Sequence, residues 1–221
     1  MTHILHIDAS ARGERSITRE LTGAFLDQWL LRRPESIITR RDVGRVPPPA
    51  ISEDWIAAAF AGDGRTAAQR ELLSLSEELI EEVFAADLIL IGAPMYNYGM
   101  PAALKAWFDQ VIRVDRTFPF ALARGHHPLE PVLTDKQLVV MASWGEFGFG
   151  PGELNADHGH LIPHIRSCSR YLGATTVEHL SVEYPEFGDA RHEASKRAAF
   201  DAMPTLVEQL QAAGPDSRVA A

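Results

Sequence analysis

The feature that most constrains the fold is an alternation, along the whole chain, between short apolar runs and segments of helical periodicity. Strands that are buried on both faces of a parallel sheet have nearly continuous hydrophobic sequences. Runs of this kind occur at residues 3–8, 36–42, 87–92, 137–143 and 175–182. Strands and helices that alternate in this way predict an α/β protein with a mainly parallel sheet.

The segments between these runs carry apolar residues at steps of three and four, which places them on one face of a helix. The faces of five predicted helices are Ile17, Leu21, Phe25 and Trp29; Leu72, Leu75, Leu79 and Val83; Leu104, Trp107, Phe108 and Val111; Leu161, Ile165, Cys168 and Leu172; and Ala199, Met203, Leu206 and Leu210. Pro204 falls within the last pattern, so we expect a kink or a break there. Together the elements predict a flavodoxin-like doubly wound fold, a five-stranded parallel sheet with helices on both faces.

The length and composition fit one globular domain. The chain has 221 residues, 46% of them hydrophobic, which is enough to bury a sizeable core. We expect a single domain over residues 1–213 and a disordered tail over 214–221, where small and polar residues gather. The formal net charge of −9 argues against a nucleic-acid partner, because neutralising phosphates needs clustered basic residues.

The sequence also predicts a cytoplasmic protein with no membrane partner. No apolar run approaches the roughly 20 residues that a membrane span requires, and the first residues lack the pattern of a signal peptide. Cys168 is the single cysteine, which excludes an intramolecular disulfide and fits a reducing compartment.

A doubly wound fold binds its ligand beyond the carboxyl ends of the strands, where the strand order reverses. We therefore expect the site in the loops that follow the first, third and fourth strands. A long connection at residues 115–131 carries aromatic, basic and histidine side chains. Long ordered connections tend to be functional, so this one can cover the site or contact a partner subunit.

The loop after the first strand has the residues of an anion site. Hydroxyl groups, a flexible backbone and the N-terminus of a helix occur together there, and they suit a phosphate. The candidate ligands are Ser10, Arg12, Ser16, Ile17 and Thr18. In the alternative interpretation Ser16 only caps the helix, and Arg12 and Arg15 lie in solvent.

This loop also excludes several classes of protein. It lacks both G-x-G-x-x-G and G-x-x-x-x-G-K-[ST], which argues against a dinucleotide-binding Rossmann domain and an NTPase. A low-molecular-weight phosphatase would need a cysteine nucleophile in this loop, whereas Cys168 belongs to the fourth helix, where a packed thiol is expected.

The loop after the third strand places polar and aromatic residues directly after a buried run. A flavin ring presents a flat face and an edge of donors and acceptors, which suits a loop with aromatic side chains, one amide and free backbone groups. The candidates are Pro94, Met95, Tyr96, Asn97 and Tyr98. Taken singly, the tyrosines can equally be packing residues and Asn97 a turn residue.

The residues 94–98 (PMYNY), followed by Pro101 and residues 104–109 (LKAWFD), resemble the flavin-ring loop of the FMN-dependent NADH-azoreductases. The same family is also described as FMN-dependent NADH:quinone oxidoreductases. The first loop and the segment from Arg116 to Phe118 are similar to this family as well. The resemblance spans most of residues 4–172, and the loop after the third strand is its most specific part.

The loop after the fourth strand contains Ser143, Trp144, Gly145 and Glu146. Members of the resembled family usually carry Ser-x-Gly-Gly here and contact the flavin through backbone groups. Glu146 stands in place of the second glycine. A carboxylate beside a flavin would disfavour the anionic reduced ring, so either Glu146 points away or the redox potential differs from that of relatives.

The resemblance implies a homodimer that binds FMN, takes a hydride from NADH or NADPH and reduces a quinone or azo acceptor in a ping-pong cycle. The flavin carries the chemistry, so no side chain is named as a catalytic acid or base. Phe118, Phe120 and Phe147 are predicted walls of the acceptor pocket. FMN rather than FAD is expected, because the first loop offers one phosphate site and no dinucleotide motif.

Two other classes remain open at this stage. A flavodoxin-type electron carrier has the same fold and no substrate of its own, although this chain is long for one. A hydrolase or a binding module would contain no flavin. No metal is expected, because the histidines match no compact zinc motif: His126, His127, His158, His160 and His164. The sequence does not assign the physiological acceptor or the preferred nicotinamide.

Overall fold

The computed structural model describes residues 1–126 and 128–213, so His127 and the predicted tail lie outside the described residues. Within these ranges five strands form one parallel sheet in the order β2-β1-β3-β4-β5. The strands are β1 (His3–Asp8), β2 (Ile37–Asp42), β3 (Leu88–Pro94), β4 (Gln137–Ser143) and β5 (Glu178–Val182). The predicted five-stranded doubly wound fold is confirmed.

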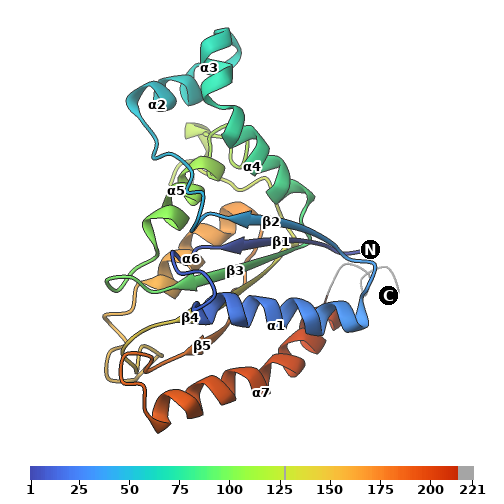
Figure 1. Ribbon diagram of the computed structural model, residues 1–221. Helices are drawn as coiled ribbons and strands as arrows, with labels where there is room; N and C mark the ends of the chain where they lie inside the picture. The colour runs from blue at the N-terminus through green and yellow to red at the C-terminus, as the bar shows by residue number, and fades with distance from the viewer. Residues whose placement is uncertain (127, 214–221) are drawn as a thin grey trace.

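Helices cover both faces of this sheet (Figure 1). On one face lie α1 (Ile17–Arg32) and α7 (Ala190–Ala212), and on the other lie α4 (Ser74–Ala85), α5 (Ala102–Val111) and α6 (Leu161–Ser169). These are the five helices that the periodicity predicts. Short 3₁₀ helices cover Gly62–Gly64, Leu122–Arg124 and Arg170–Leu172.

The core has two layers, one on each face of the sheet, and the central strand supplies both. All seven residues of β3 are buried. Because successive side chains point to opposite faces, Leu88 and Leu90 join the core with α1 and α7. Ile89 and Ile91 join the core with α4, α5 and α6. This two-sided burial explains the unbroken apolar run in the sequence.

Two helices were not predicted, α2 (Glu53–Phe60) and α3 (Ala67–Leu72), and they project away from the sheet (Figure 1). The expected long helix from Leu72 to Val83 was wrong at its start, because α3 ends at Leu72 and α4 begins at Ser74. The reason is local. Thr66 and Gln69 form a capping box that begins a separate short helix, and Leu72 is 43% exposed at its end.

Of the kink or break predicted at Pro204, the break was wrong, since α7 is continuous through it. A proline removes one backbone donor from a helix. Met203, Leu206 and Val207 on either side are buried against the sheet, so packing holds the helix together.

The carboxyl ends of β1, β3, β4 and β5, which are neighbours in the sheet, meet at one edge. Asp8 lies opposite Gly92, Pro94 lies opposite Ser143, and Ser143 lies opposite Val182. The loops after β1, β3, β4 and β5 therefore leave the sheet side by side. No helix in the described part of the chain is long and apolar enough to cross a membrane.

Candidate functional site

A cavity of about 340 Å³, here called the loop cavity, lies among these four loops. Its lining residues are Ser10, Arg12, Arg15, Ser16, Ile17, Pro94, Met95, Tyr96, Ser143, Trp144, Gly145, Pro185 and Glu186. Except for Arg15, Pro185 and Glu186, these are residues that the sequence nominates as cofactor ligands. The structure therefore brings most of the predicted site together.

The first loop ends at the N-terminus of α1, which is capped by Ser16. The Ser16 hydroxyl accepts the amide of Arg19 at 3.4 Å and lies 3.1 Å from the Thr18 hydroxyl. The amides of Ile17 and Thr18 have no hydrogen-bond partner within residues 1–126 and 128–213. Unpaired first-turn amides and the positive end of the helix dipole make an anion site.

The hydroxyls at this end differ in their placement. Ser10 and Ser16 line the loop cavity although each is almost fully buried. Thr18 is fully buried behind Ser16 and does not line it. Ser10 also accepts the amide of Arg12 at 3.2 Å, which closes the loop into a tight turn.

Arg19, in the first turn of α1, lies beneath this loop and was not predicted as a site residue. Its guanidinium donates to Asp42 at 2.6 and 2.7 Å and to Asp8 at 3.2 Å. It also donates to the carbonyls of Ser10 at 2.8 Å and Arg12 at 2.9 Å. A basic residue three positions after a helix cap is common on helix surfaces, so the sequence alone gave no signal for this role.

The loop after β3 is a two-residue hairpin. Tyr96 and Gly99 exchange two backbone hydrogen bonds of 3.0 Å, and Asn97 and Tyr98 between them have φ of 45° and 66°. Two positive φ values define a type I′ turn, in which asparagine is favoured and tyrosine is unusual. Asn97 is exposed and lies outside the cavity lining, as does Tyr98.

A side-chain hydrogen bond from the hairpin links the third loop to the first. A backbone hydrogen bond links the third loop to the fourth. The Tyr96 hydroxyl accepts the amide of Ala11 at 3.3 Å. The amide of Met95 donates to the carbonyl of Ser143 at 2.8 Å. The loops that line the cavity thus form one connected rim.

Glu146 points away from the loop cavity and accepts a hydrogen bond from the Tyr98 hydroxyl at 3.0 Å. This hydrogen bond and the negative charge of Glu146 raise the pKa of Tyr98. The carboxylate that lines the cavity is instead Glu186, from the loop after β5. A Cβ at Gly145 would lie 2.4 Å from the Glu186 carboxyl carbon, so glycine makes room for it.

The contribution of the loop after β5 was missed, although a signal was present. The residues 184–188 (YPEFG) are turn formers that follow the fifth strand, and in this strand order that loop reaches the same edge.

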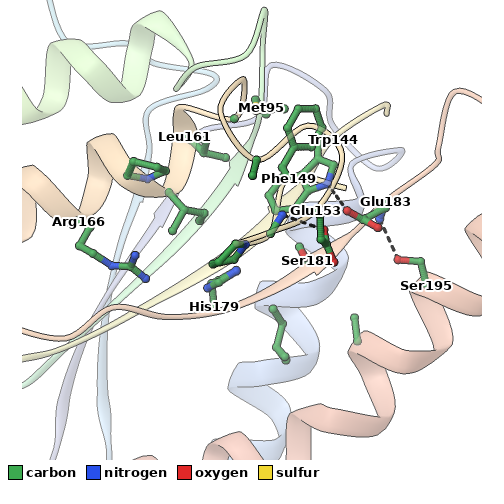
Figure 2. A pocket seen from close by; sticks show the side chains of 18 of the residues that line it. Met95, Trp144, Phe149, Glu153, Leu161, Arg166, His179, Ser181, Glu183 and Ser195 are labelled. Carbon is green, nitrogen blue, oxygen red and sulfur yellow. Dashed lines mark hydrogen bonds between the residues drawn. The ribbon is translucent and has the colours of Figure 1, made fainter. Parts of the chain in front are cut away.

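A second cavity of about 510 Å³, here called the edge cavity, shares Met95 and Trp144 with the loop cavity. It lies between α6 and α7, beside the outer strand β5. Figure 2 shows Arg166 and His179 on one side of it and Glu183 on the other. Burial and the nearby Arg166 lower the pKa of His179, which favours a neutral imidazole.

Trp144 is the wall between the two cavities. Its indole N–H donates to the Glu183 carboxylate at 2.9 Å, and the amide of Gly148 donates to the same oxygen at 3.0 Å. The amide of Glu183 donates to the Ser195 hydroxyl at 2.9 Å (Figure 2). The wall is therefore anchored to α7.

The three predicted acceptor-pocket phenylalanines line neither cavity in this chain. Phe118 packs edge-on against Tyr171 with ring centroids 5.4 Å apart. Phe120 is 54% exposed. Phe147 stacks on Tyr184 at 4.8 Å, in the loop after β5.

Within the described ranges no group of three histidine, cysteine, aspartate or glutamate side chains is placed to hold a metal ion. His160 is the cap residue of α6, and its amide donates to the Tyr98 carbonyl at 2.7 Å. Cys168 is partly buried against the core, and that burial raises the pKa of its thiol.

Comparison with known proteins places this geometry in a family. The family model of the flavodoxin-like fold matches residues 2–210. The FMN-dependent NADH:quinone oxidoreductase 2 of Idiomarina loihiensis is 46% identical over 225 residues, covering 98% of this chain and 94% of that protein. This chain belongs to the FMN-dependent NADH:quinone oxidoreductases.

A further member of the family agrees with that assignment, and two solved structures share the fold. The FMN-dependent NAD(P)H:quinone oxidoreductase 1 of Pseudomonas aeruginosa is 40% identical, with 88% of this chain and 93% of that protein covered. Crystal structures of an azoreductase from Bacillus anthracis and of an FMN-dependent NADH-azoreductase from the same organism, in complex with FMN, each give a TM-score of 0.82. Their identities are 21% and 16%, with at least 95% of this chain covered, so they support the fold alone.

The residues of the loop cavity fit the cofactor that gives the family its name. At one end are the unpaired amides of α1, two serine hydroxyls and the two arginines of the first loop, a donor set suited to a phosphate. At the other end are Met95, Tyr96 and Trp144, whose apolar and aromatic surfaces suit a flat ring.

Proposed function

We propose that this chain is an FMN-dependent NADH:quinone oxidoreductase that passes two electrons from a nicotinamide nucleotide to quinones and, more slowly, to aromatic azo compounds. The observation that carries the proposal is the loop cavity, in which a phosphate-binding helix terminus faces apolar and aromatic walls. The names of the related proteins support it. Full cleavage of an azo bond needs two successive two-electron steps, hence the slower reaction.

When bound, FMN would supply the two-electron redox chemistry. The chain's own groups bind and orient. Ser10, Ser16 and the first amides of α1 would hold the phosphate, and Arg12 and Arg15 would add positive charge. Met95, Tyr96 and Trp144 would present their apolar and aromatic side chains to the ring.

The proposed cycle is ping-pong, because donor and acceptor would use the same open side of the cavity in turn. No side chain is required to act as acid or base. NADH is expected to be preferred over NADPH only weakly, since no described loop can be assigned to the ribose 2′ position.

We also propose a homodimer in the cytoplasm. Large apolar side chains of the 115–131 connection and of α2 are exposed in the single chain, among them Phe120, Leu122 and Phe60 at 54%, 76% and 70%. A second copy would cover such a surface and could bring these phenylalanines to a flavin. Light scattering at micromolar concentration tests this, and a fully active monomer would contradict it. The free Cys168 suits a reducing compartment.

Two measurements test the function. Flavin released by heat from the purified protein is identified by chromatography, with stoichiometric FMN expected. NADH consumption is then followed with benzoquinone, a naphthoquinone or a simple azo dye. A protein that contains FMN but reduces none of them would be an electron carrier, and a protein without flavin would overturn the proposal.

A further inference from the structure

We propose that Arg19 is a positioning residue that sets the first loop for binding the phosphate of FMN. It holds two backbone carbonyls of the loop and, at the same time, balances the charge of two carboxylates beneath it. The inference rests on the proposed function, because FMN is the phosphate-bearing ligand. Arg19 does not line the loop cavity, so it acts through the loop.

Every N–H group of the Arg19 guanidinium donates a hydrogen bond. Its Nε donates to the carbonyl of Arg12, Nη1 donates to Asp8 and Asp42, and Nη2 donates to Asp42 and the carbonyl of Ser10. An arginine side chain has five N–H donors in a fixed planar fork, and here each has an acceptor. The side chain is only 16% exposed, and the bonds to Asp8, Asp42 and Ser10 are partly buried, whereas the bond to the Arg12 carbonyl is exposed.

The two carbonyl contacts fix the orientation of two peptide groups. In a planar trans peptide the N–H points opposite to the C=O. With the Ser10 carbonyl held by Arg19, the following amide of Ala11 faces the other way and reaches the Tyr96 hydroxyl on the cavity rim. The Arg12 carbonyl is held in the same way, which turns the amide of Gly13 away from Arg19.

The second role of Arg19 concerns the negative charges of Asp8 and Asp42. Asp8 and Asp42 end β1 and β2, and they are register partners across the sheet. Their side chains are only 13% and 32% exposed, and Arg19 links them to the carbonyl of Ser10, a residue that lines the loop cavity. Two negative charges there would repel an anion; Arg19 pairs with both, and the more exposed Arg45 also lies 3.6 Å from Asp42.

The surrounding residues are built to keep this group in place. Although burial opposes ionisation, hydrogen bonds from Arg19 hold the pKa of Asp42 below its usual range. Thr22 donates its hydroxyl to Asp8 at 3.1 Å. A Cβ at Gly92 would lie 2.6 Å from an Asp8 carboxylate oxygen, so glycine leaves the space that the carboxylate occupies.

The chain offers a matched control in Arg41. Its Nε donates to both oxygens of Glu82 at 2.8 and 2.9 Å, and it also pairs with Glu78. It is therefore a second partly buried arginine with two carboxylate partners, but it touches no loop carbonyl. Replacing it tests what the loss of such an ion pair does without any change to the first loop.

The experiment titrates the wild-type apoprotein and its variants with FMN and with riboflavin, which lacks the phosphate. In Arg19→Lys and Arg19→Gln, FMN should bind about tenfold more weakly or worse, while riboflavin affinity changes less than about twofold. Arg41→Lys should leave both affinities within about twofold. Circular dichroism melting of each apoprotein establishes that it folds.

Asp42→Asn tests the charge balance separately. It keeps Arg19, and it is expected to fold because Asp42 is partly exposed. Asp42→Asn removes one negative charge while Arg19 still holds both carbonyls, so FMN should bind at least as tightly as to wild type, with riboflavin unchanged. Weaker FMN binding in Asp42→Asn would overturn the charge balance.

An equal loss of both flavins in the Arg19 variants, or no loss of either, would overturn the positioning role. A wild-type protein that binds neither flavin would overturn the proposed function itself, and this inference with it.

Discussion

The loop cavity and the edge cavity lie on either side of Met95 and Trp144, and the smaller one has the features of a binding site. The loop cavity is lined by loops at the carboxyl ends of four strands, and the amides of Ile17 and Thr18 at its helix end have no partner in the described part of the chain. The edge cavity is larger and is lined by α6, α7, β5 and residues 149–159 of the loop after β4, and the N-terminus of α1 does not reach it. The N-terminus of a helix, set where the strand ends meet, therefore identifies the site better than volume does.

The hydrogen-bonding groups of the two cavities also differ in what they bind. In the edge cavity, Glu183 accepts from Trp144 and Gly148, and Ser195 accepts from the Glu183 amide. Glu183 and Ser195 are thus occupied in holding the wall, whereas Arg166 and His179 on the other side of the cavity take no part in these bonds. At the α1 end of the loop cavity, Arg19 holds the first loop from outside the lining, and the amide of Ile17 in the lining has no partner within the described residues.

The largest expected effect comes from a negative charge at the loop cavity. Ser16→Asp keeps a good helix cap but places a carboxylate where the phosphate would bind. FMN affinity should fall about 100-fold, because a like charge about 4 Å away costs a few kcal/mol at an effective dielectric constant near 20. The measurement is FMN titration of the apoprotein.

Two controls make the result specific to this cavity. Ser16→Asn provides a neutral cap of the same shape and should lose far less FMN affinity than Ser16→Asp. Ser181→Asp introduces the same charge into the edge cavity, where Ser181 is part of the lining, and should leave FMN binding within about twofold. If Ser181→Asp proved as damaging as Ser16→Asp, the contrast between the cavities would be lost.

A smaller effect is expected at the shared wall. Trp144→Phe removes the indole donor to Glu183 and leaves unfilled volume, so it should lower the free energy of unfolding by about 1–2 kcal/mol. Glu183 keeps its bond from Gly148, which limits the loss. Denaturant unfolding measures this.

Trp55→Phe is the matched control for the wall. The Trp55 indole donates to Gln110 at 3.0 Å in the small core under α2 and α3. Trp55 lines neither cavity. Both substitutions should lower stability, but only Trp144→Phe should also weaken FMN binding. Equal FMN affinity in the two variants would argue against Trp144 as a wall of the cofactor site.

Sequence reasoning was strong where one residue carries a local signal and weak where partners come from distant segments. The buried strands and the Ser16 cap follow from local patterns, and both are present. The network of Arg19 with Asp8 and Asp42 joins three segments that are adjacent only once β1 and β2 pair. Nothing in the spacing of these residues shows that contact.

The same limit applies to the rim of the site. Glu146 was a candidate cofactor ligand because it follows the fourth strand. Its hydrogen-bond partner is Tyr98, whose position is set by the type I′ turn at Asn97 and Tyr98. Tyrosine is not a residue that predicts a positive φ, so this turn could not be derived from composition. Glu186 enters the site only through the space that Gly145 leaves.

The smallest effect concerns the Tyr98–Glu146 pair, which joins the loops after β3 and β4. The hydrogen bond to Glu146 and its charge raise the pKa of Tyr98, so this phenol should titrate above the usual value of about 10. Because the folded state holds the proton more tightly, the small stabilisation is present below the pKa of the unfolded tyrosine and is lost as the pH rises through the folded pKa. Glu146→Gln keeps an acceptor without the charge and should return the pKa of Tyr98 toward 10. The tyrosinate absorbance of each protein, after subtraction of a Tyr98→Phe titration, gives this pKa. An identical pKa with Glu146 and with Gln at this position would show that the carboxylate faces elsewhere in solution, and the possibility that it acts on the flavin would reopen.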